Sequence, residues 1–407
     1  MSPQMLRRDL LKALPAVTAL AAVPRLRGAT IKITDVKRFR TRVVRETGTI
    51  INWVGIPNAQ RVGGTSFIEI HTDQGLIGLG PTVNEDEVAG LKKKLVGREP
   101  FDIERLAAEL RAGSNGGGGG AVGFTARGGA SAEIALWDLI GKATNQPLYK
   151  LWGGFKNKIV PYASQMRLGT PEERARQASK LKSEGWQALK YRTHFPTFKD
   201  DVRLVEETRK AVGDEWKIMC DANMATTQPV ADRPFQWDFR RAVETARAYQ
   251  QMNVYWLEEP LPRYDFEQIA ELNRMVDMMI AGGEGNNGLH EFRWLLEQGC
   301  YDIVQPEVLF EGPTLLRKVA VLAESMGKYC VPHNGGRDLG VICCMHLVAS
   351  WPNAPVLELW HDPPELDYNN GFAIFENPPK VDKDGFFHLP EGPGLGVTIN
   401  KEMVENG

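Results

Sequence analysis

The chain has 407 residues, with 49 basic and 51 acidic side chains and a formal net charge of −2. This length suits a barrel plus a second domain, and the mixed charges exclude a basic nucleic-acid surface and a polybasic membrane patch. The five cysteines are odd in number and mostly lie in or beside apolar runs. They argue against a disulfide framework and a cysteine metal site, and they favour buried free thiols.

The first 29 residues resemble an export signal. Arg7 and Arg8 precede an apolar run from Ala13 to Val23, which is too short for a transmembrane helix. Paired arginines are typical of twin-arginine export, which carries folded proteins and suits unpaired cysteines. We expect residues 1–29 to be removed, leaving a periplasmic or secreted protein without a stable membrane anchor.

The next part of the chain predicts a small α+β domain. Residues 66–72 and 76–80 form a predicted hairpin, and helical periodicity covers residues 85–95, 102–111 and 127–144. The five glycines at 116–120 favour a flexible loop over a phosphate cradle, because no Lys-Ser/Thr follows them. Residues 46–64 are long enough for a mobile lid, in which Trp53 would form an apolar ceiling or pack the interdomain seam.

From about residue 159 the pattern changes to strand, loop and helix, repeated. Eight such strands predict an α/β fold, a TIM-like barrel. The expected strand ends lie near Ser164, Arg192, Asp221, Glu258, Glu284, Glu307, His333 and Glu358. Thr170 and Pro171 have the residue types of a helix cap and first helical position.

Three carboxylates end successive predicted strands: Asp221, Glu258 and Glu284. The C-terminal ends of barrel strands converge on one mouth, where carboxylates would repel one another unless a cation held them. Oxygen ligands alone suit Mg²⁺. Glu259 competes with Glu258, and only one of them can face the mouth because adjacent strand residues point to opposite faces. Asn223 shares the face of Asp221 and would bind substrate or a ligand water, or form a turn.

Three segments resemble long motifs of the enolase superfamily, in its mandelate racemase-like branch of acid-sugar dehydratases and racemases. They are Ala132–Lys142, Gln146–Gly154 and Gly392–Val397. The resemblance implies an α+β capping domain over a (β/α)₇β barrel, one Mg²⁺, proton abstraction beside a carboxylate, and a homo-oligomer. We expect a capping domain over residues 30–155, completed by 378–407, and a barrel over 156–377. The family pattern favours Glu258 over Glu259.

Lys190 and Arg192 share one face at the end of the second strand and supply fixed positive charge. Such charge is needed because removing the α-proton of a carboxylate creates a dianion. Members of the branch commonly carry Lys-x-Lys here, with the second Lys as a base. Arg192 is a poor base and suits clamping a carboxylate, or a surface ion pair. His194 would either replace the lost base or cap the loop.

His333 and Glu307 match the family's His–Asp dyad, with Glu in place of Asp. A carboxylate on one imidazole nitrogen fixes the tautomer and raises basicity. Glu358 matches a family Glu that donates a hydrogen bond to the substrate carboxylate when it is protonated; the alternative is a salt-bridged Glu. His361 lies near the predicted mouth and is grouped with the expected substrate-binding residues.

Together these features predict a Mg²⁺-dependent hydro-lyase that acts on a small carboxylate substrate. His333, assisted by Glu307, would remove the α-proton of a sugar acid or related 2-hydroxy acid, giving a 2-keto-3-deoxy acid. A racemase or epimerase is the first alternative; Arg192 weakens it, and His194 as a second base would revive it. A non-catalytic periplasmic ligand-binding protein on the same fold is the alternative of another class. The complete carboxylate triad and His333 argue against that alternative.

Overall fold

A computed structural model of the chain describes residues 30–114, 123–225 and 236–405. The predicted export signal and the run of five glycines lie outside these ranges. The described residues from 32 to 405 form one compact unit. Within the described ranges, no helix combines the length and apolar character that a membrane crossing requires.

The capping domain is built on the predicted hairpin, which the structure confirms as β4 (Ser66–Thr72) and β5 (Ile77–Gly80). Strand β1 (Ile33–Arg40) pairs with β4 to complete a three-stranded sheet. The helices are α1 (Glu87–Leu95), α2 (Ile103–Ser114), α3 (Ala126–Ala143) and α4 (Leu148–Leu151). Helix α3 packs very closely on β5. A Cβ atom added to Gly78 of β5 would lie only 2.2 Å from the carbonyl oxygen of Ala135 on α3.

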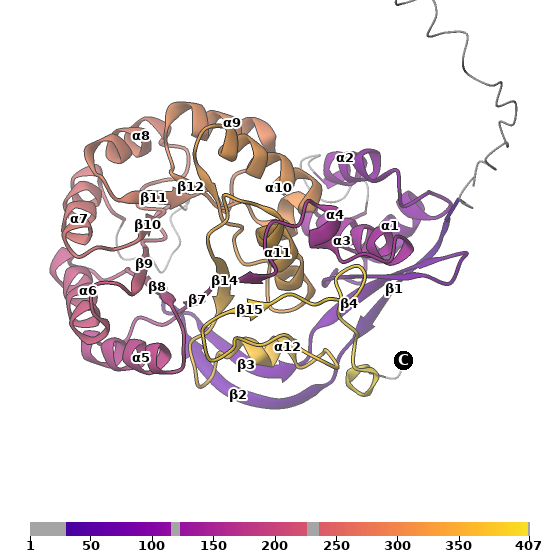
Figure 1. The fold of residues 1–407 in the computed structure, drawn as a ribbon, viewed down its shortest axis with the longest axis horizontal. Helices are drawn as coiled ribbons and strands as arrows, with labels where there is room; N and C mark the ends of the chain where they lie inside the picture. The colour runs from indigo at the N-terminus through magenta and orange to yellow at the C-terminus, as the bar shows by residue number, and fades with distance from the viewer. Residues whose placement is uncertain (1–29, 115–122, 226–235, 406–407) are drawn as a thin grey trace, which may run out of the picture. The chain divides into compact units, whose positions relative to one another are not determined.

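The predicted lid over residues 46–64 is an ordered β-hairpin instead of a long loop. Strands β2 (Val43–Ile51) and β3 (Pro57–Gly63) are antiparallel, and the Asn52 side chain accepts hydrogen bonds from the backbone N–H groups of Val54 and Ile56. Thr47 Oγ1 donates to the carbonyl oxygen of Glu365 at 2.8 Å, in the segment that follows the last barrel strand. The hairpin therefore spans from the capping sheet to the barrel (Figure 1).

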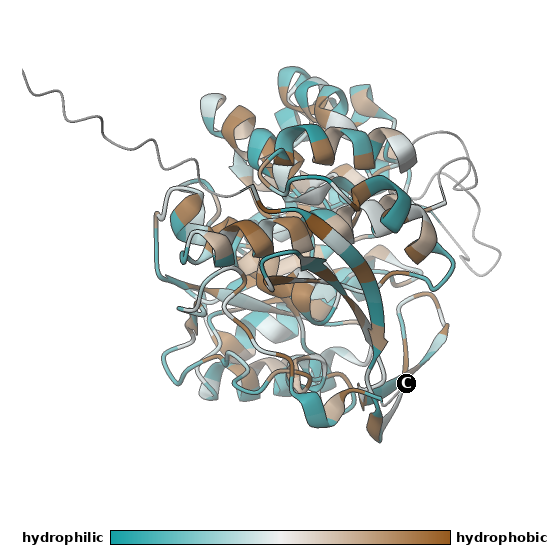
Figure 2. Ribbon diagram, turned by 90° about the vertical axis from the view of Figure 1, so that its right-hand side faces the viewer, coloured by the Kyte–Doolittle hydropathy of each residue, from teal (hydrophilic) through white to brown (hydrophobic). Residues whose placement is uncertain are grey.

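The second domain is a modified TIM barrel, a curled sheet of eight parallel strands in the order β13-β12-β11-β10-β9-β8-β7-β14. The strands are β7 (Pro161–Ser164), β8 (Ala188–Arg192), β9 (Lys217–Asp221), β10 (Trp256–Glu258), β11 (Met279–Gly282), β12 (Ile303–Val304), β13 (Tyr329–Cys330) and β14 (Leu357–Trp360). The helices that surround them are α5 (Pro171–Ser183), α6 (Phe198–Val212), α7 (Phe239–Gln251), α8 (Phe266–Met275), α9 (Gly288–Gln298), α10 (Val308–Ser325) and α11 (Leu339–Ser350) (Figure 1). Hydrophilic and hydrophobic bands alternate along helices in Figure 2, as expected of helices with one buried face.

Four strands end at residues other than those expected from the sequence. β11, β12 and β13 stop before Glu284, Glu307 and His333, which lie in the following loops, while Glu358 lies inside β14. The predicted cap of the first barrel helix is confirmed, because Thr170 Oγ1 accepts a hydrogen bond from the Glu173 N–H at 3.2 Å.

One layer of apolar side chains closes the inside of the barrel. Each strand, or the residue beside it, contributes one member: Tyr162, Ala188, Met219, Trp256, Ala281, Ile303, Val331 and Val356. All are 0–1% exposed. The rings of Tyr162 and Trp256 make an edge contact with centroids 5.4 Å apart. This layer is the floor on which the polar mouth is built.

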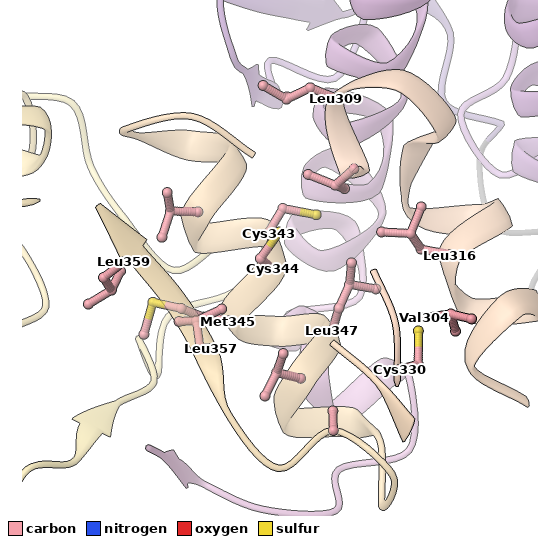
Figure 3. Close-up of a cluster of buried hydrophobic side chains, with 14 of the residues drawn as sticks. Val304, Leu309, Leu316, Cys330, Cys343, Cys344, Met345, Leu347, Leu357 and Leu359 are labelled. Atoms are coloured by element: carbon pink, nitrogen blue, oxygen red, sulfur yellow. The ribbon is translucent and has the colours of Figure 1, made fainter. Parts of the chain in front are cut away.

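The main core lies between the sheet and its covering helices, and Figure 3 shows the part around α10 and α11. Cys330, Cys343 and Cys344 pack there among leucines, and all five cysteines of the chain are buried free thiols, as predicted.

The C-terminal segment leaves the barrel through α12 (Tyr368–Phe372) and then contacts the capping domain. Strand β15 (Phe387–His388) pairs with β6 (Lys158–Ile159), and the 3-10 helix η1 covers Lys401–Met403. The carboxylate of Asp138 on α3 accepts hydrogen bonds from the N–H of Leu79 at 2.8 Å and of Leu395 at 2.7 Å. One buried carboxylate therefore joins the hairpin, α3 and the C-terminal return.

We expect Asp362→Asn to lower the free energy of unfolding at neutral pH by about 3–5 kcal/mol, the usual cost of breaking a buried ion pair. Asp362 is fully buried, and its Oδ1 atom lies 2.9 Å from Arg174 Nη1 and 3.0 Å from Arg167 Nη2. The substitution leaves Arg174, itself 0% exposed, without its counter-charge. Urea unfolding followed by circular dichroism measures the difference.

The same pair predicts a pH dependence. Burial alone raises the pKa of Asp362, but Arg174 and Arg167 more than offset burial and hold that pKa below its ordinary value. The stabilisation is therefore complete above the unfolded pKa of about 3.9 and is lost as the pH falls below it. Glu184→Gln, which removes an exposed partner of Lys180, is the matched control and should not change stability measurably. Equal stability of Asp362→Asn and the natural protein at neutral pH would contradict the assignment.

Candidate active site

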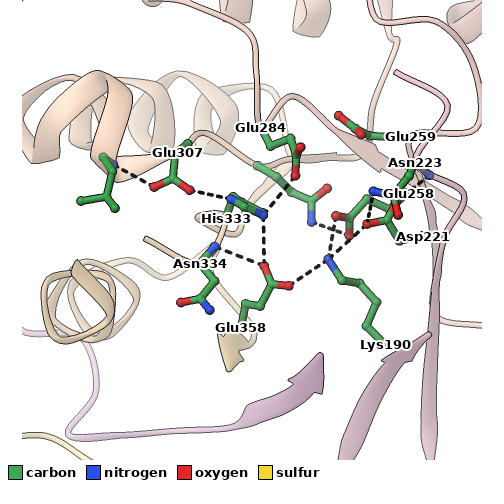
Figure 4. Close-up of polar contacts among 12 residues, drawn as sticks. Lys190, Asp221, Asn223, Glu258, Glu259, Glu284, Glu307, His333, Asn334 and Glu358 are labelled. Carbon is green, nitrogen blue, oxygen red and sulfur yellow. Dashed lines mark hydrogen bonds and ion pairs between the residues drawn. The ribbon is translucent and has the colours of Figure 1, made fainter. Parts of the chain in front are cut away.

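The polar mouth of the barrel lies one layer above the apolar floor. Two positions after floor residues come Lys190, Asp221, Glu258, Gln305, His333 and Glu358. Side chains two residues apart on a strand share a face, so the alternation that buries the floor also directs these polar groups into the mouth. Figure 4 shows most of them converging from several strands.

Lys190 is the positive centre of this cluster and is fully buried. Its Nζ atom lies 2.7 Å from Glu258 Oε1, 3.0 Å from Glu358 Oε1 and 3.7 Å from Asp221 Oδ2. Burial alone lowers the pKa of Lys190, but these carboxylates more than offset burial and hold that pKa above its ordinary value. Lys190 is therefore a fixed cation that joins strands β8, β9, β10 and β14.

Arg192 contacts Asp221, its neighbour in the parallel ladder, and is also buried. Its Nη1 atom donates to Asp221 Oδ2 and, at 3.2 Å, to Asn223 Oδ1. Its guanidinium carbon lies 4.4 Å from the ring centre of Trp53, at the tip of the β2–β3 hairpin. The structure thus brings three predicted site residues, Trp53, Arg192 and Asn223, around one strand-end carboxylate.

His333 and Glu307 form the predicted hydrogen-bonded pair. His333 Nδ1 lies 2.5 Å from Glu307 Oε2, while Glu307 Oε1 accepts a hydrogen bond from the Leu309 N–H at 2.8 Å. Glu307 is the N-cap of α10, so the helix start holds its carboxylate in place. His333 Nε2 lies 3.0 Å from Glu284 Oε2. Burial lowers the pKa of His333, but Glu284 and Glu307 offset it and raise the pKa to about 10.

Glu358 lies between the two cations of the mouth. It pairs with Lys190, and its Oε2 atom accepts a hydrogen bond from the Asn334 N–H at 3.2 Å. Burial raises the pKa of Glu358, but Lys190 and His333 more than offset burial and hold that pKa well below its ordinary value. Of the two alternatives drawn from the sequence, the structure favours the ion-paired carboxylate over a protonated donor.

Glu258 and its neighbour Glu259 point in different directions (Figure 4). Glu258 Oε2 accepts hydrogen bonds from Trp256 Nε1 at 3.0 Å and Gln305 Nε2 at 2.8 Å. Glu259 has a positive φ of 45°, and its Oε1 atom lies 3.6 Å from Arg263 Nη2. The backbone therefore separates the two carboxylates, with Glu258 beside Lys190.

Two predicted substrate-binding histidines have contacts outside the Lys190–His333 cluster. The ring of His361 stacks on Trp186 with centroids 4.8 Å apart and contacts Tyr368 of α12. His194 is buried, and its Nδ1 atom hydrogen-bonds with the carbonyl oxygen of Ala222 at 3.2 Å, beside the loop after β9.

Sequence reasoning missed Trp256 and Gln305, which orient Glu258. Both lie two residues before a predicted site carboxylate, Glu258 and Glu307 respectively. The period-two pattern that selected the carboxylates would therefore have found their partners.

The mouth fits a hard divalent cation by donor type and by charge. In the described part of the chain, no three His, Cys, Asp or Glu side chains are already arranged so that they could hold a metal ion. Asp221, Glu258 and Glu284 instead contact Arg192, Lys190 and His333 respectively. Burial and the nearby Glu258 raise the pKa of Asp221 to about 7, which shows how crowded the negative charge is. A cation bound by these oxygens would offset that charge.

Comparison with known families agrees with this architecture. Residues 173–403 match the enolase C-terminal domain-like family, and residues 59–153 match the mandelate racemase / muconate lactonizing enzyme N-terminal domain. Together the two matches cover the barrel from α5 onward and most of the capping domain.

Individual relatives are named for sugar acids. A 3,6-anhydro-alpha-L-galactonate cycloisomerase of Streptomyces coelicolor is 30% identical over 83% of this chain and 89% of its own length. An L-talarate/galactarate dehydratase of Salmonella typhimurium is 27% identical over 91% and 94%. The crystal structure of D-glucarate dehydratase from Agrobacterium tumefaciens complexed with magnesium is 28% identical, with a TM-score of 0.78 over 90% of this chain and 96% of that one. Further matches include racemases.

Proposed function

This chain belongs to the mandelate racemase and muconate lactonizing enzyme family of the enolase superfamily, and from that premise we propose that it dehydrates a sugar acid. The hydrogen-bonded pair of His333 and Glu307, facing Lys190 across the mouth, is the observation that carries the proposal. The substrate is a small 2-hydroxy carboxylate with a hydroxyl on the β-carbon.

In the proposed reaction His333 is the only base. Its Nε2 atom takes the α-proton when the ring is neutral, and Glu307 on Nδ1 stabilises the resulting imidazolium. A cation held by Glu284 would offset the carboxylate charge that raises the pKa of His333, and would so favour the neutral ring. The electron pair of the broken C–H bond forms a double bond, and the β-hydroxyl leaves as water with the proton that His333 returns. Tautomerisation of the enol gives a 2-keto-3-deoxy acid.

The wall of the mouth opposite His333 supplies positive charge. Lys190 and Arg192 offset the negative charge that develops on the substrate carboxylate, and Glu358 positions Lys190 through their 3.0 Å ion pair. Asp221, Glu258 and Glu284 would hold Mg²⁺. When bound, that ion would act as a Lewis acid toward the substrate carboxylate. The magnesium complex of the related D-glucarate dehydratase supports this choice of ion.

The same geometry favours dehydration over racemisation. Racemisation needs a proton donor and acceptor on both faces of the α-carbon. Opposite His333 stand an ammonium paired with carboxylates and a guanidinium bonded to Asp221, and neither is a general base. Cycloisomerisation is the second candidate, because the relative that is 30% identical carries that name.

We expect the mature protein with Mg²⁺ to turn over one or a few members of a sugar-acid panel in D₂O. Proton NMR should show the α-proton signal disappear while a 3-deoxy methylene appears. A 3-deoxy product formed from an anhydro or lactone substrate without loss of water would assign a cycloisomerase. Deuterium at the α-carbon without loss of water would assign a racemase or epimerase. No proton exchange across a broad panel, with Mg²⁺ bound, would refute the enzyme and favour the ligand-binding alternative.

A further inference from the structure

Apart from the barrel mouth, a polar cavity lies between the end of the β2–β3 hairpin and the loop that follows β13. It has a volume of about 160 Å³ and is lined from the capping side by Arg61 and Thr65 and from the barrel side by Arg337, Asp338 and Asn370. This volume is well above the ~10–15 Å³ that a single water needs. None of these residues belongs to the Lys190–His333 cluster.

The guanidinium groups of Arg61 and Arg337 line this cavity, and among the described residues neither forms an ion pair. Arg337 Nη2 donates to Gln60 Oε1, and its guanidinium carbon lies 5.9 Å from the ring centre of Trp360. Burial and the positive charge of Arg61 lower the pKa of Arg337 from its ordinary value. Arg61 is exposed and Arg337 is half-buried, and Asp338 supplies one negative charge to these two positive ones. An anion in the cavity would offset the remaining positive charge.

Asp338 lies beside the two arginines, but other donors hold its carboxylate. Its Oδ2 atom accepts a hydrogen bond from Thr65 Oγ1 at 3.1 Å, and its Oδ1 atom accepts one from the Leu339 N–H at 2.7 Å. The carboxylate therefore caps α11 and links the capping domain to the barrel. Arg337 has the neutral side chain of Gln60 as its hydrogen-bond partner.

We propose that this cavity binds a small oxyanion, held by charge-assisted hydrogen bonds from Arg61 and Arg337. The oxyanion is either a free phosphate-like ion or the far carboxylate of a sugar diacid whose other end occupies the barrel mouth. Arg61 belongs to β3 of the hairpin, and Arg337 follows His333 by four residues. A bound oxyanion thus ties the hairpin to the loop that carries His333.

Titration calorimetry with sodium sulfate tests the proposal on the mature, Mg²⁺-loaded protein, because sulfate does not precipitate with Mg²⁺. We expect saturable binding with one site per chain. Arg61→Gln and Arg337→Gln should each weaken that binding about tenfold or more, because each removes charge-assisted hydrogen bonds. Arg45→Gln is the matched control, since Arg45 is an exposed arginine of the same hairpin outside the cavity. It should bind sulfate like the natural protein.

A second titration, in the inactive His333→Asn protein saturated with a sugar diacid, separates the two sources of the oxyanion. Loss of sulfate binding assigns the cavity to the far carboxylate of the substrate, and unchanged binding assigns it to a free oxyanion. Arg337→Gln removes a contact with Gln60 and could disturb folding, so Arg61→Gln, on the exposed side, carries the comparison alone if Arg337→Gln loses structure. Absence of saturable binding at millimolar sulfate, or equal affinity in all variants, overturns the proposal. The sulfate titration of the natural protein requires no turnover, so it fails or succeeds separately from the proposed dehydratase activity.

Discussion

Replacing His333 with Asn is expected to lower kcat by about 10²–10⁴-fold, the range that a general base contributes. The substitution removes the proton acceptor at Nε2. Asn keeps a polar group of similar reach beside Glu307, so the fold should change little. Substrate-dependent loss of the α-proton, followed by NMR, should fall by the same factor as kcat.

Two further variants show whether the His333 result concerns chemistry or structure. Glu307→Gln retains an oxygen that can cap α10 at the Leu309 N–H but loses the charge beside His333. It should therefore lower kcat with little loss of stability. Glu307→Ala loses both and should also cost about 1 kcal/mol of stability through the missing helix cap. His388→Asn, at an exposed histidine paired with Asp382, should leave kcat unchanged. A His333→Asn protein with near-normal α-proton exchange would refute the assigned base.

Lys190→Met is the second large effect that we expect, and it concerns stability as well as activity. Methionine fills similar space but leaves the carboxylates of Asp221, Glu258 and Glu358 facing one another without their shared cation. Breaking a buried ion pair on one side typically costs about 3–5 kcal/mol. The metal-free variant should therefore unfold at lower urea concentration than the natural protein. Catalysis should also be lost, because a fixed positive charge near the substrate carboxylate is gone.

Added Mg²⁺ provides the diagnostic measurement for this variant. If the same carboxylates hold the ion, Mg²⁺ should raise the unfolding midpoint of Lys190→Met more than that of the natural protein, because the ion replaces the missing charge. Lys210→Met, which removes an exposed lysine paired with Glu207, is the matched control and should show neither effect. A Lys190→Met protein that is as stable as the natural one without Mg²⁺ would contradict the central role of this ion cluster.

Much of the active-site wall follows from local sequence pattern alone. Period-two alternation in short apolar strands determines which side chains enter the barrel, so the pattern assigns Lys190, Asp221 and Glu358 to one mouth. The choice of Glu258 over Glu259 came from the family resemblance. The pairing of His333 with Glu307 followed from the family resemblance, and the structure shows that hydrogen bond. The contacts of single side chains were less predictable, as His361 shows. It follows β14, and its stacking on the ring of Trp186 could not be read from the pattern.

The sequence by itself determined the class of fold, the buried free cysteines and the set of polar residues at the strand ends, because these depend on hydrophobic periodicity within each segment. Only the tertiary structure decided which of those groups contact one another and which carry a charge. Trp53 covers Arg192, the start of α10 holds Glu307, and Lys190 keeps Glu358 ionised. Each of these depends on the packing of segments far apart in the chain, and ion-pair energies in a buried site change steeply with distance and burial. For the same reason, only the packing of the hairpin against the barrel brings the charges of Arg61 and Arg337 to one cavity.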